Sequence, residues 1–173
     1  DPGRVHTALT SAVEHLFDRE HNVVRLFDPP ITRRTPETGY VRSYGAGLRE
    51  NGGQYTHGAL WLAMALLRTG RTAEGAEILH AVLPAAHDPA RYEGEPYVLA
   101  ADIAGGDNAG VAGWTWYTGA AGWYLRIAAE DLLGLHLRGG VLFPEPHLPA
   151  GWPEWTVRWR DGAGLLHTVR LRP

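Results

Sequence analysis

The sequence contains no cysteine and no lysine, and its only methionine is Met64. Without cysteine the chain forms neither disulfides nor thiolate metal sites, and its compartment cannot be read from its thiols. No run reaches the roughly 18 apolar residues that a membrane span needs, and no signal peptide opens the chain. The formal charge of -3 offers no basic footprint for nucleic acid and no polybasic patch for a membrane surface.

All sixteen basic residues are arginine, and alanine and glycine are abundant. This usage indicates a GC-rich bacterial genome, and we expect a bacterial cytoplasmic protein. Hydrophobic residues make up 45% of the chain and charged residues 20%, which is typical of a soluble globular domain. A chain of 173 residues is long enough to bury a core. It begins Asp1-Pro2-Gly3 without an initiator methionine, so we expect a processed product or a fragment.

Helical periodicity alternates with glycine- and proline-rich stretches along the first three quarters of the chain. Residues 28–47 predict a long irregular loop, of the kind that is usually functional. The helix over 59–67 is apolar on every side and should be buried all round, whereas the helix over 72–83 has a polar, solvent-exposed face. The predicted helices, each bounded by residues that favour helix ends, cover residues 1–19, 59–67, 72–83, 95–103 and about 118–133.

After Gly134 the period changes to two, which predicts a hairpin around Gly139-Gly140 and a second around Asp161-Gly162. Buried helices that alternate with helices exposed to solvent on one face are the pattern of a helical toroid. Five helices are too few to close such a ring, and two hairpins are too few for a sandwich. We therefore expect the C-terminal part of a larger protein, with helices of a barrel over 1–134 and hairpins of a β-domain over 135–173.

The segment 113–124 holds three tryptophans, two tyrosines and three glycines. Thr118 is predicted to cap the following helix through its hydroxyl, which leaves the N–H groups of Gly119 and Ala120 as a seat for an anion. Aromatic rings such as those of Trp116 and Tyr117 beside that seat suit a sugar, which has an apolar face and polar edges. The alternative is that these rings are buried around a tight turn.

The polar block 49–57 directly precedes the buried helix, and it carries three further candidates. His57 should lie near the helix start, where it can bind an anion when protonated or donate a hydrogen bond when neutral. Glu50 lies on the approach loop, and Arg49 is a candidate ligand for an anion or a hydroxyl. The alternative for His57 is a structural histidine that is satisfied by its packing near the buried helix. The alternative for Arg49 is a solvated loop residue.

Glu95 and Asp102 are seven residues apart, and on a helix this spacing would place them roughly 10 Å apart on one side. Such a pair would resemble the two carboxylates of an inverting glycosidase. The favoured alternative is that Glu95 stabilises a helix start and that Asp102 caps a loop. No H-E-x-x-H, Walker or G-x-S-x-G motif occurs, and we predict no metal site.

Five blocks stand out in order along the chain: Gly39-Tyr40-Val41, the run from Arg49 to His57, Glu95-Pro96-Tyr97-Val98, the run from Gly113 to Gly119, and Gly122-Trp123. They resemble glycoside hydrolase family 94, which holds the cellobiose and chitobiose phosphorylases and the C-terminal region of cyclic β-1,2-glucan synthases. The likeness covers nearly the whole chain, and its Ala100-Ala101-Asp102 variant resembles the branch of the cyclic glucan synthases and β-1,2-oligoglucan phosphorylases.

This resemblance implies a mainly α fold, namely the C-terminal part of an (α/α)6 barrel followed by strands of a C-terminal β-sandwich. It implies inverting phosphorolysis of a β-glucosidic bond, with inorganic phosphate as co-substrate, no cofactor and a sugar 1-phosphate as product. His57, Thr118 and Gly119 match three of the family's four phosphate ligands. The fourth, an arginine, and the aspartate that acts as general acid belong to motifs that this chain lacks, so it carries no catalytic residue of its own. Residues assigned to the substrate are Arg49, Glu50, Gln54, Trp116 and Tyr117.

The partners we expect are a β-linked gluco-oligosaccharide such as a β-1,2-glucan, phosphate, the rest of the same polypeptide, and a second copy of the chain in a homodimer. Alone, the chain should be inactive. Two other functions stay open, a barrel-type glycoside hydrolase or lyase that uses water or a base, and a non-catalytic carbohydrate-binding remnant.

Overall fold

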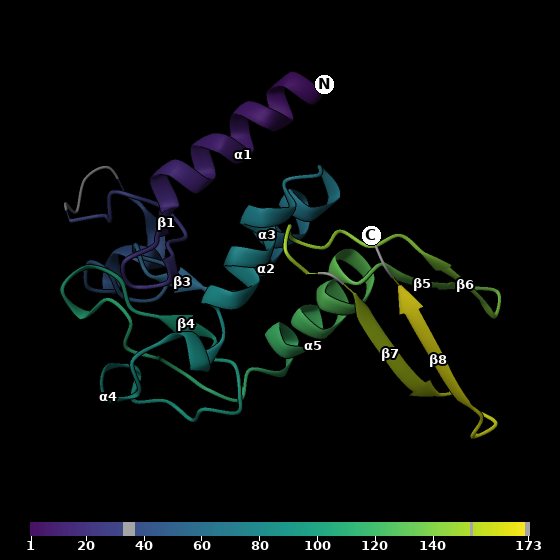
Figure 1. Cartoon of the computed structure of the whole chain (residues 1–173). Coiled ribbons are helices and arrows are strands. Elements are labelled where there is room, and N and C mark those ends of the chain that lie inside the picture. Colours follow the sequence, from purple (N-terminus) through teal and green to yellow (C-terminus); the bar gives the residue numbers. More distant parts are fainter. Residues whose placement is uncertain (33–36, 153, 172–173) are drawn as a thin grey trace.

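The computed structural model describes residues 1–32, 37–152 and 154–171, and these form mainly helices with small two-stranded sheets (Figure 1). The helices are α1 (Pro2–Leu16), α2 (Thr56–Arg68), α3 (Thr72–Ala81), α4 (Pro89–Tyr92), α5 (Thr118–Arg126) and its π-helical continuation η4 (Ile127–Leu132), with 3₁₀ turns η1 (Gly39–Ser43), η2 (Pro84–Ala86) and η3 (Gly106–Asn108). The strands are β1 (Phe17–Asp18), β2 (Val23–Val24), β3 (Gln54–Tyr55), β4 (Asp102–Ile103), β5 (Leu135–Arg138), β6 (Val141–Pro144), β7 (Trp155–Arg160) and β8 (Leu166–Leu171).

The first helix begins where the sequence predicts. The carboxylate of Asp1 accepts hydrogen bonds from the backbone N–H groups of Gly3 and Arg4, at 2.9 and 3.4 Å, and a proline occupies the first turn. Leu9 and Val13 are the buried residues of this helix. Because α1 packs through this narrow stripe alone, most of it extends away from the other helices, at the top of Figure 1.

The main core surrounds α2, which packs against α3, α5 and η4 (Figure 1). Leu60, Leu66 and Leu67 are fully buried. A methyl group at Gly75 would lie 2.7 Å from Cγ of Leu67, so the glycine lets α3 approach α2 closely. This arrangement of paired helices is compatible with part of an (α/α) barrel.

The prediction that the helix over 59–67 is buried on every side is wrong at Trp61, whose side chain is 51% exposed. Its ring contacts His57 and Trp123 edge-on, with ring centroids 5.9 and 5.8 Å apart. Trp61 therefore packs with other aromatic rings at the loop end of α2 and not in the core.

The helix predicted over 95–103 does not form. The carbonyl of Trp114 accepts a hydrogen bond from the N–H of Ala101, and the carbonyl of Ala101 accepts one from the N–H of Thr56. β4 then pairs antiparallel with β3. This extended segment is bonded on both sides by distant parts of the chain, and such pairing outweighs local helix propensity. Glu95 and Asp102 are consequently not two turns apart on a helix.

The two predicted hairpins form, and each makes a two-stranded antiparallel sheet of its own, β5–β6 and β7–β8. Both lie at the end of the molecule away from β3 and β4 (Figure 1). η4 ends at Leu132 and β5 begins at Leu135, so the change from helix to strand lies at the predicted boundary. The division into two domains and the β-sandwich stay predictions. Across the described ranges, no helix has the length and apolar character that crossing a bilayer requires.

Candidate functional site

His57 and the start of α5 meet at the loop end of the helix pair. His57 is the second residue of α2. A methyl group built on Gly119 would lie 2.8 Å from Cε1 and 3.4 Å from Nε2 of the imidazole. The edge of the ring that carries Nε2 therefore packs directly on the first turn of α5, which brings together two of the three residues predicted to bind phosphate.

Thr118 is the first residue of α5, and the prediction that it caps the helix is wrong. Tyr117 is the N-cap residue, and no side chain caps this end. The N–H groups of Ala120 and Ala121 bond the carbonyl of Tyr117, at 3.1 and 3.3 Å. The first N–H groups of a helix have no partner within it, so the uncapped end of α5, with Thr118 and Gly119 at its tip, is available to an anion.

Three aromatic rings enclose the imidazole of His57. Tyr55 stacks on it with centroids 5.7 Å apart at 24°, while Tyr117 and Trp61 meet it edge-on at 5.7 and 5.9 Å. The hydroxyls of Tyr55 and Tyr117 lie 3.2 Å apart, and this hydrogen bond is the main reason that the pKa of Tyr55 is raised. His57 Nδ1 is buried and has no hydrogen-bond partner among the described residues. The ring is thus held by aromatic packing.

Arg49 and Glu50 lie on the tight turn that precedes β3. Arg49 adopts a left-handed backbone conformation, with φ of 49°, which is uncommon outside glycine and asparagine. Its guanidinium lies between the rings of Tyr44 and Trp114, 5.2 and 4.8 Å from their centroids. Its Nε is 3.9 Å from Oε2 of Glu50, and both atoms are buried without a hydrogen-bond partner in the described part of the chain. Both side chains remain partly exposed.

Gln54 occupies a different place from the substrate contact that the sequence predicts. Its side chain is fully buried. Its Oε1 accepts a hydrogen bond from the N–H of Val24 at 2.9 Å, and its Nε2 donates to Oγ1 of Thr56 at 3.3 Å. Gln54 therefore ties β2 to the start of α2, and its polar atoms are used by the fold.

Trp116 is exposed, as a sugar platform would be, and it also adopts a left-handed conformation, with φ of 61°. Its indole N–H donates to Oε1 of Glu95 at 3.1 Å. Hydrogen bonds from the side chains of Thr115 and, less strongly, Trp116 lower the pKa of Glu95. Sequence reasoning assigned Glu95 to a helix start; its position as the acceptor that holds this turn was missed.

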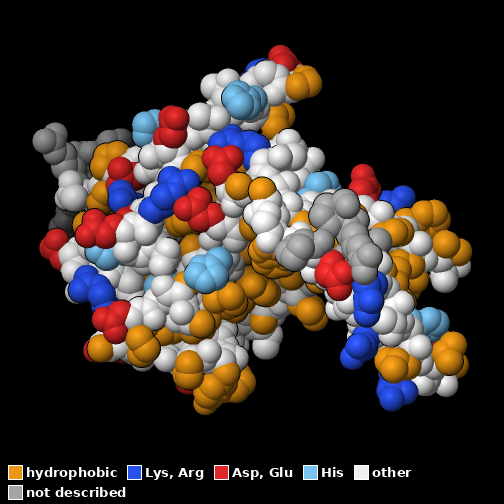
Figure 2. All heavy atoms as spheres, in the orientation of Figure 1, with side chains coloured by type: hydrophobic (Ala, Val, Ile, Leu, Met, Phe, Trp, Pro, Cys, Tyr) orange, Lys and Arg blue, Asp and Glu red, His pale blue; other side chains and the backbone are white. Residues whose placement is uncertain are grey.

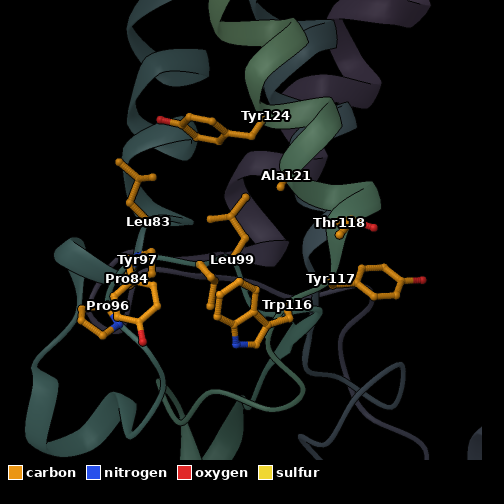
Figure 3. A pocket seen from close by; sticks show the side chains of 11 residues that line it. Leu83, Pro84, Pro96, Tyr97, Leu99, Trp116, Tyr117, Thr118, Ala121 and Tyr124 are labelled. Atoms are coloured by element: carbon orange, nitrogen blue, oxygen red, sulfur yellow. The ribbon is translucent and has the colours of Figure 1, made fainter.

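An open cleft of about 490 Å³ lies beside the start of α5, and Tyr117 and Thr118 are among the residues that line it (Figure 3). Leu83, Pro84 and Tyr124 form its walls together with residues 96–99, Trp116 and Ala121. The lining is mostly apolar, and hydrophobic side chains spread over the same region of the surface in Figure 2.

Asp102 supports the loop, as its favoured alternative stated. It is buried, and its Oδ1 accepts a hydrogen bond from the N–H of Trp114 at 3.2 Å. Any side chain at Gly113 would collide with this carboxylate, since a methyl group there would lie 2.1 Å from Oδ2. Across the described residues, no group of three or more histidines and carboxylates is arranged to hold a metal ion.

Paired helices, aromatic rings and an uncapped helix end beside a histidine therefore meet at one end of a mainly helical protein. The family model of the glycosyl hydrolase 94 superfamily catalytic domain matches residues 2–134. The chain belongs to this family.

Three relatives illustrate the match. The chain is 42% identical to cyclic beta-(1,2)-glucan synthase NdvB of Rhizobium meliloti over 99% of its own length and 6% of the relative's. It is 30% identical to solabiose phosphorylase of Paenibacillus borealis, over 92% of the chain and 21% of the relative. It is 28% identical to N,N'-diacetylchitobiose phosphorylase of Vibrio proteolyticus, over 91% of the chain and 20% of the relative. The chain thus spans no more than about a fifth of these relatives.

Proposed function

We propose that this chain is the part of a glycoside phosphorylase that binds phosphate next to a β-linked gluco-oligosaccharide. The observation that carries the proposal is the packing of the Nε2 edge of His57 on Gly119 at the uncapped start of α5. An imidazole N–H and helix N–H groups converge there, and both donate to anion oxygens. Membership of the family supports the same reading.

The reaction we propose is an inverting displacement. A phosphate oxygen attacks the anomeric carbon while the glycosidic C–O bond breaks, and the leaving oxygen takes a proton from a carboxylic acid. The products are a sugar 1-phosphate of inverted configuration and a shortened saccharide. His57, Thr118 and Gly119 hold the phosphate, while Trp116 and Tyr117 stand beside it.

The proton donor comes, in this proposal, from a longer polypeptide. Asp102 is unsuited to the role because it is buried and bonded to the N–H of Trp114. Glu50 is unsuited as well, because its buried Oε2 faces the guanidinium of Arg49, 3.9 Å from Nε. The 173-residue chain alone should therefore show no phosphorolysis.

The substrate we propose is a β-1,2-linked gluco-oligosaccharide. The support is that identity to the cyclic beta-(1,2)-glucan synthase is 42%, against 30% and 28% for the phosphorylases named above. A comparison of β-1,2- with β-1,4-linked oligosaccharides in the longer polypeptide, with release of glucose 1-phosphate as the readout, tests this part.

The test of the phosphate site is a calorimetric titration with inorganic phosphate. His57→Ala should weaken binding by about 2 kcal/mol, the value of a hydrogen bond to a charged group. His15→Ala, on the exposed side of α1, should leave it unchanged. In the longer polypeptide, His57→Ala should cost about 2–4 kcal/mol in phosphate-dependent turnover. If both variants bind phosphate equally well, His57 is a packing residue and the proposal fails.

Two other functions are separated by the same experiments. A hydrolase or lyase of the same helical type would turn over oligosaccharide without phosphate. A carbohydrate-binding module would bind oligosaccharide, and the longer polypeptide would show no turnover at all.

A further inference from the structure

Four side chains form a continuous row of contacts on the face that carries Arg49. The guanidinium of Arg49 lies between Tyr44 and Trp114, 5.2 and 4.8 Å from their ring centroids. Tyr40 meets Tyr44 edge-on, with centroids 6.2 Å apart at 90°. We call Tyr40, Tyr44, Arg49 and Trp114 the aromatic strip.

The backbone beneath the strip is anchored from both sides. The fully buried Asn51 donates from Nδ2 to the carbonyl of Tyr44 at 2.8 Å. Arg49 accepts a hydrogen bond at its carbonyl from the N–H of Gly53 at 3.0 Å. On the other side the N–H of Trp114 bonds buried Asp102. The fold therefore fixes the backbone of Tyr44, Arg49 and Trp114 beneath side chains that it does not bury.

The two ends of the strip are open. The side chain of Trp114 is 69% exposed and that of Tyr40 is 66% exposed. Large aromatic residues contribute most to stability when they are buried, so burial does not explain why these rings are held in place. Fixed and exposed aromatic faces with a cation between them suit a ligand that has flat apolar faces and hydroxyl edges.

The guanidinium of Arg49 points to the same ligand class. Its Nε is buried, but the Arg49 side chain as a whole is 34% exposed. The guanidinium is planar and carries five N–H donors. A row of pyranose rings, each with C–H faces and hydroxyl edges, can use the ring faces and these donors together.

The strip adjoins the proposed phosphate site. The charges of Glu50 and Arg49 both act on the hydroxyl of Tyr55, the first raising and the second lowering its pKa. The ring of Tyr55 in turn stacks on His57. From His57, the site therefore continues past Tyr55 and Arg49 toward η1, where Tyr40 lies.

We propose that the aromatic strip binds the sugar units of a gluco-oligosaccharide beyond the bond that is cleaved, so that the site favours chains longer than a disaccharide. This inference rests on the proposed function, because that function places the reacting bond next to His57. Stacking on Trp114 and Tyr40 supplies the added affinity, and Arg49 donates to hydroxyl groups between them.

The test is calorimetric titration of the full chain, without phosphate, with β-1,2-linked gluco-oligosaccharides of increasing length. Affinity should rise with length beyond the disaccharide. Trp114→Ala should weaken binding of the longest saccharide about tenfold, the size of one stacking contact, and should leave disaccharide binding unchanged. Tyr40→Ala, which removes the outermost ring, should act in the same direction. Trp152→Ala, which removes an exposed tryptophan next to the hairpins, is the matched control.

The outcomes separate the two proposals. Three outcomes would each overturn the proposal that the aromatic strip binds saccharide. These are an affinity that does not depend on saccharide length, no binding of any saccharide, and equal effects of Trp114→Ala and Trp152→Ala. Loss of length dependence in Tyr40→Ala supports it even if Trp114→Ala fails to fold. If affinity depends on saccharide length but His57→Ala leaves phosphate binding unchanged, then the proposed phosphate site is wrong and the aromatic strip is still supported as a saccharide site.

Discussion

Gly119 is the residue on which the imidazole of His57 rests, since a methyl group on its α-carbon would lie 2.8 Å from Cε1 of that ring. The ring cannot retreat freely, because Tyr55 stacks on it and Trp61 meets it edge-on. The distance between the helix start and the imidazole is therefore set by the absence of one side chain. This relation can be tested without touching any group that donates a hydrogen bond.

The first prediction is that Gly119→Ala weakens phosphate binding about tenfold or more, since the methyl group must displace His57 from the helix start. The substitution should not weaken the helix itself, because alanine favours helix over glycine by about 1 kcal/mol. Calorimetric titration with phosphate measures the effect. Gly122→Ala is the matched control, because no atom lies within 4 Å of a methyl group at that position of α5. Equal phosphate affinity in the two variants would contradict the model of a cradle between His57 and α5.

The second prediction concerns the hydroxyls of Tyr55 and Tyr117, which lie 3.2 Å apart. They join β3 to the N-cap of α5 and so connect the two halves of the phosphate site. In Tyr117→Phe the pKa of Tyr55 should fall toward its ordinary value of 10.0, because the lost hydrogen bond is the largest cause of the raised pKa.

An alkaline absorbance titration measures this shift, and Tyr97→Phe, on an exposed ring elsewhere, should leave it unchanged. A double-mutant cycle with Tyr55→Phe and Tyr117→Phe should give a coupling of about 0.5 kcal/mol in phosphate binding. Strictly additive effects would mean that the two hydroxyls do not act together on the site.

The third prediction is a loss of stability in mild acid that depends on His87. This residue is 9% exposed, stacks on Tyr92 and bonds the carbonyl of Ala81 at 2.9 Å. Burial lowers its pKa below the ordinary 6.5, more than the bond to Ala81 raises it. The unfolded chain therefore takes up the proton first as the pH falls. The stability is fully present above pH 6.5 and is lost as the pH falls through the lowered pKa.

Melting temperatures between pH 8 and pH 5 test this point. His87→Phe should be less stable by about 1 kcal/mol at pH 8, because it loses a hydrogen bond, and its stability should decline less on acidification. His6→Gln, on exposed α1, should follow the wild-type profile. An unchanged slope in His87→Phe would assign the acid sensitivity to other groups.

Local signals in the sequence were sufficient where the structure is decided locally. The cap at Asp1, the helix end at Gly70 and the hairpin at Gly139-Gly140 all follow from the conformational preferences of a few adjacent residues, and all three appear in the structure. The proximity of His57 to Gly119 was predicted through the family resemblance, because no periodicity relates residues that lie on two different helices.

The sequence was misleading where distant hydrogen bonds decide the structure. Residues 95–103 have an apolar, proline-headed pattern typical of a helix, yet Ala101 bonds Trp114 and Thr56 on its two sides. The left-handed conformation of Trp116 has no local signature, because tryptophan rarely adopts it. Glu95, which bonds that tryptophan, could therefore not be assigned from its position in the chain.

The last prediction follows from this carboxylate. The pKa of Glu95 is lowered from its ordinary 4.5, first by a hydrogen bond from the side chain of Thr115 and less strongly by Trp116. The contact with the Trp116 indole is therefore complete above pH 4.5 and is lost as the pH falls through the lowered pKa. The indole N–H resonance of Trp116 should shift during an acid titration, and Glu95→Gln should abolish that titration. In Thr115→Val the midpoint should move up toward 4.5, since the largest cause of the lowered pKa is removed. If Thr115→Val leaves the midpoint in place while Glu95→Gln removes the titration, then Trp116 alone holds the carboxylate, and the turn before α5 depends on that single contact.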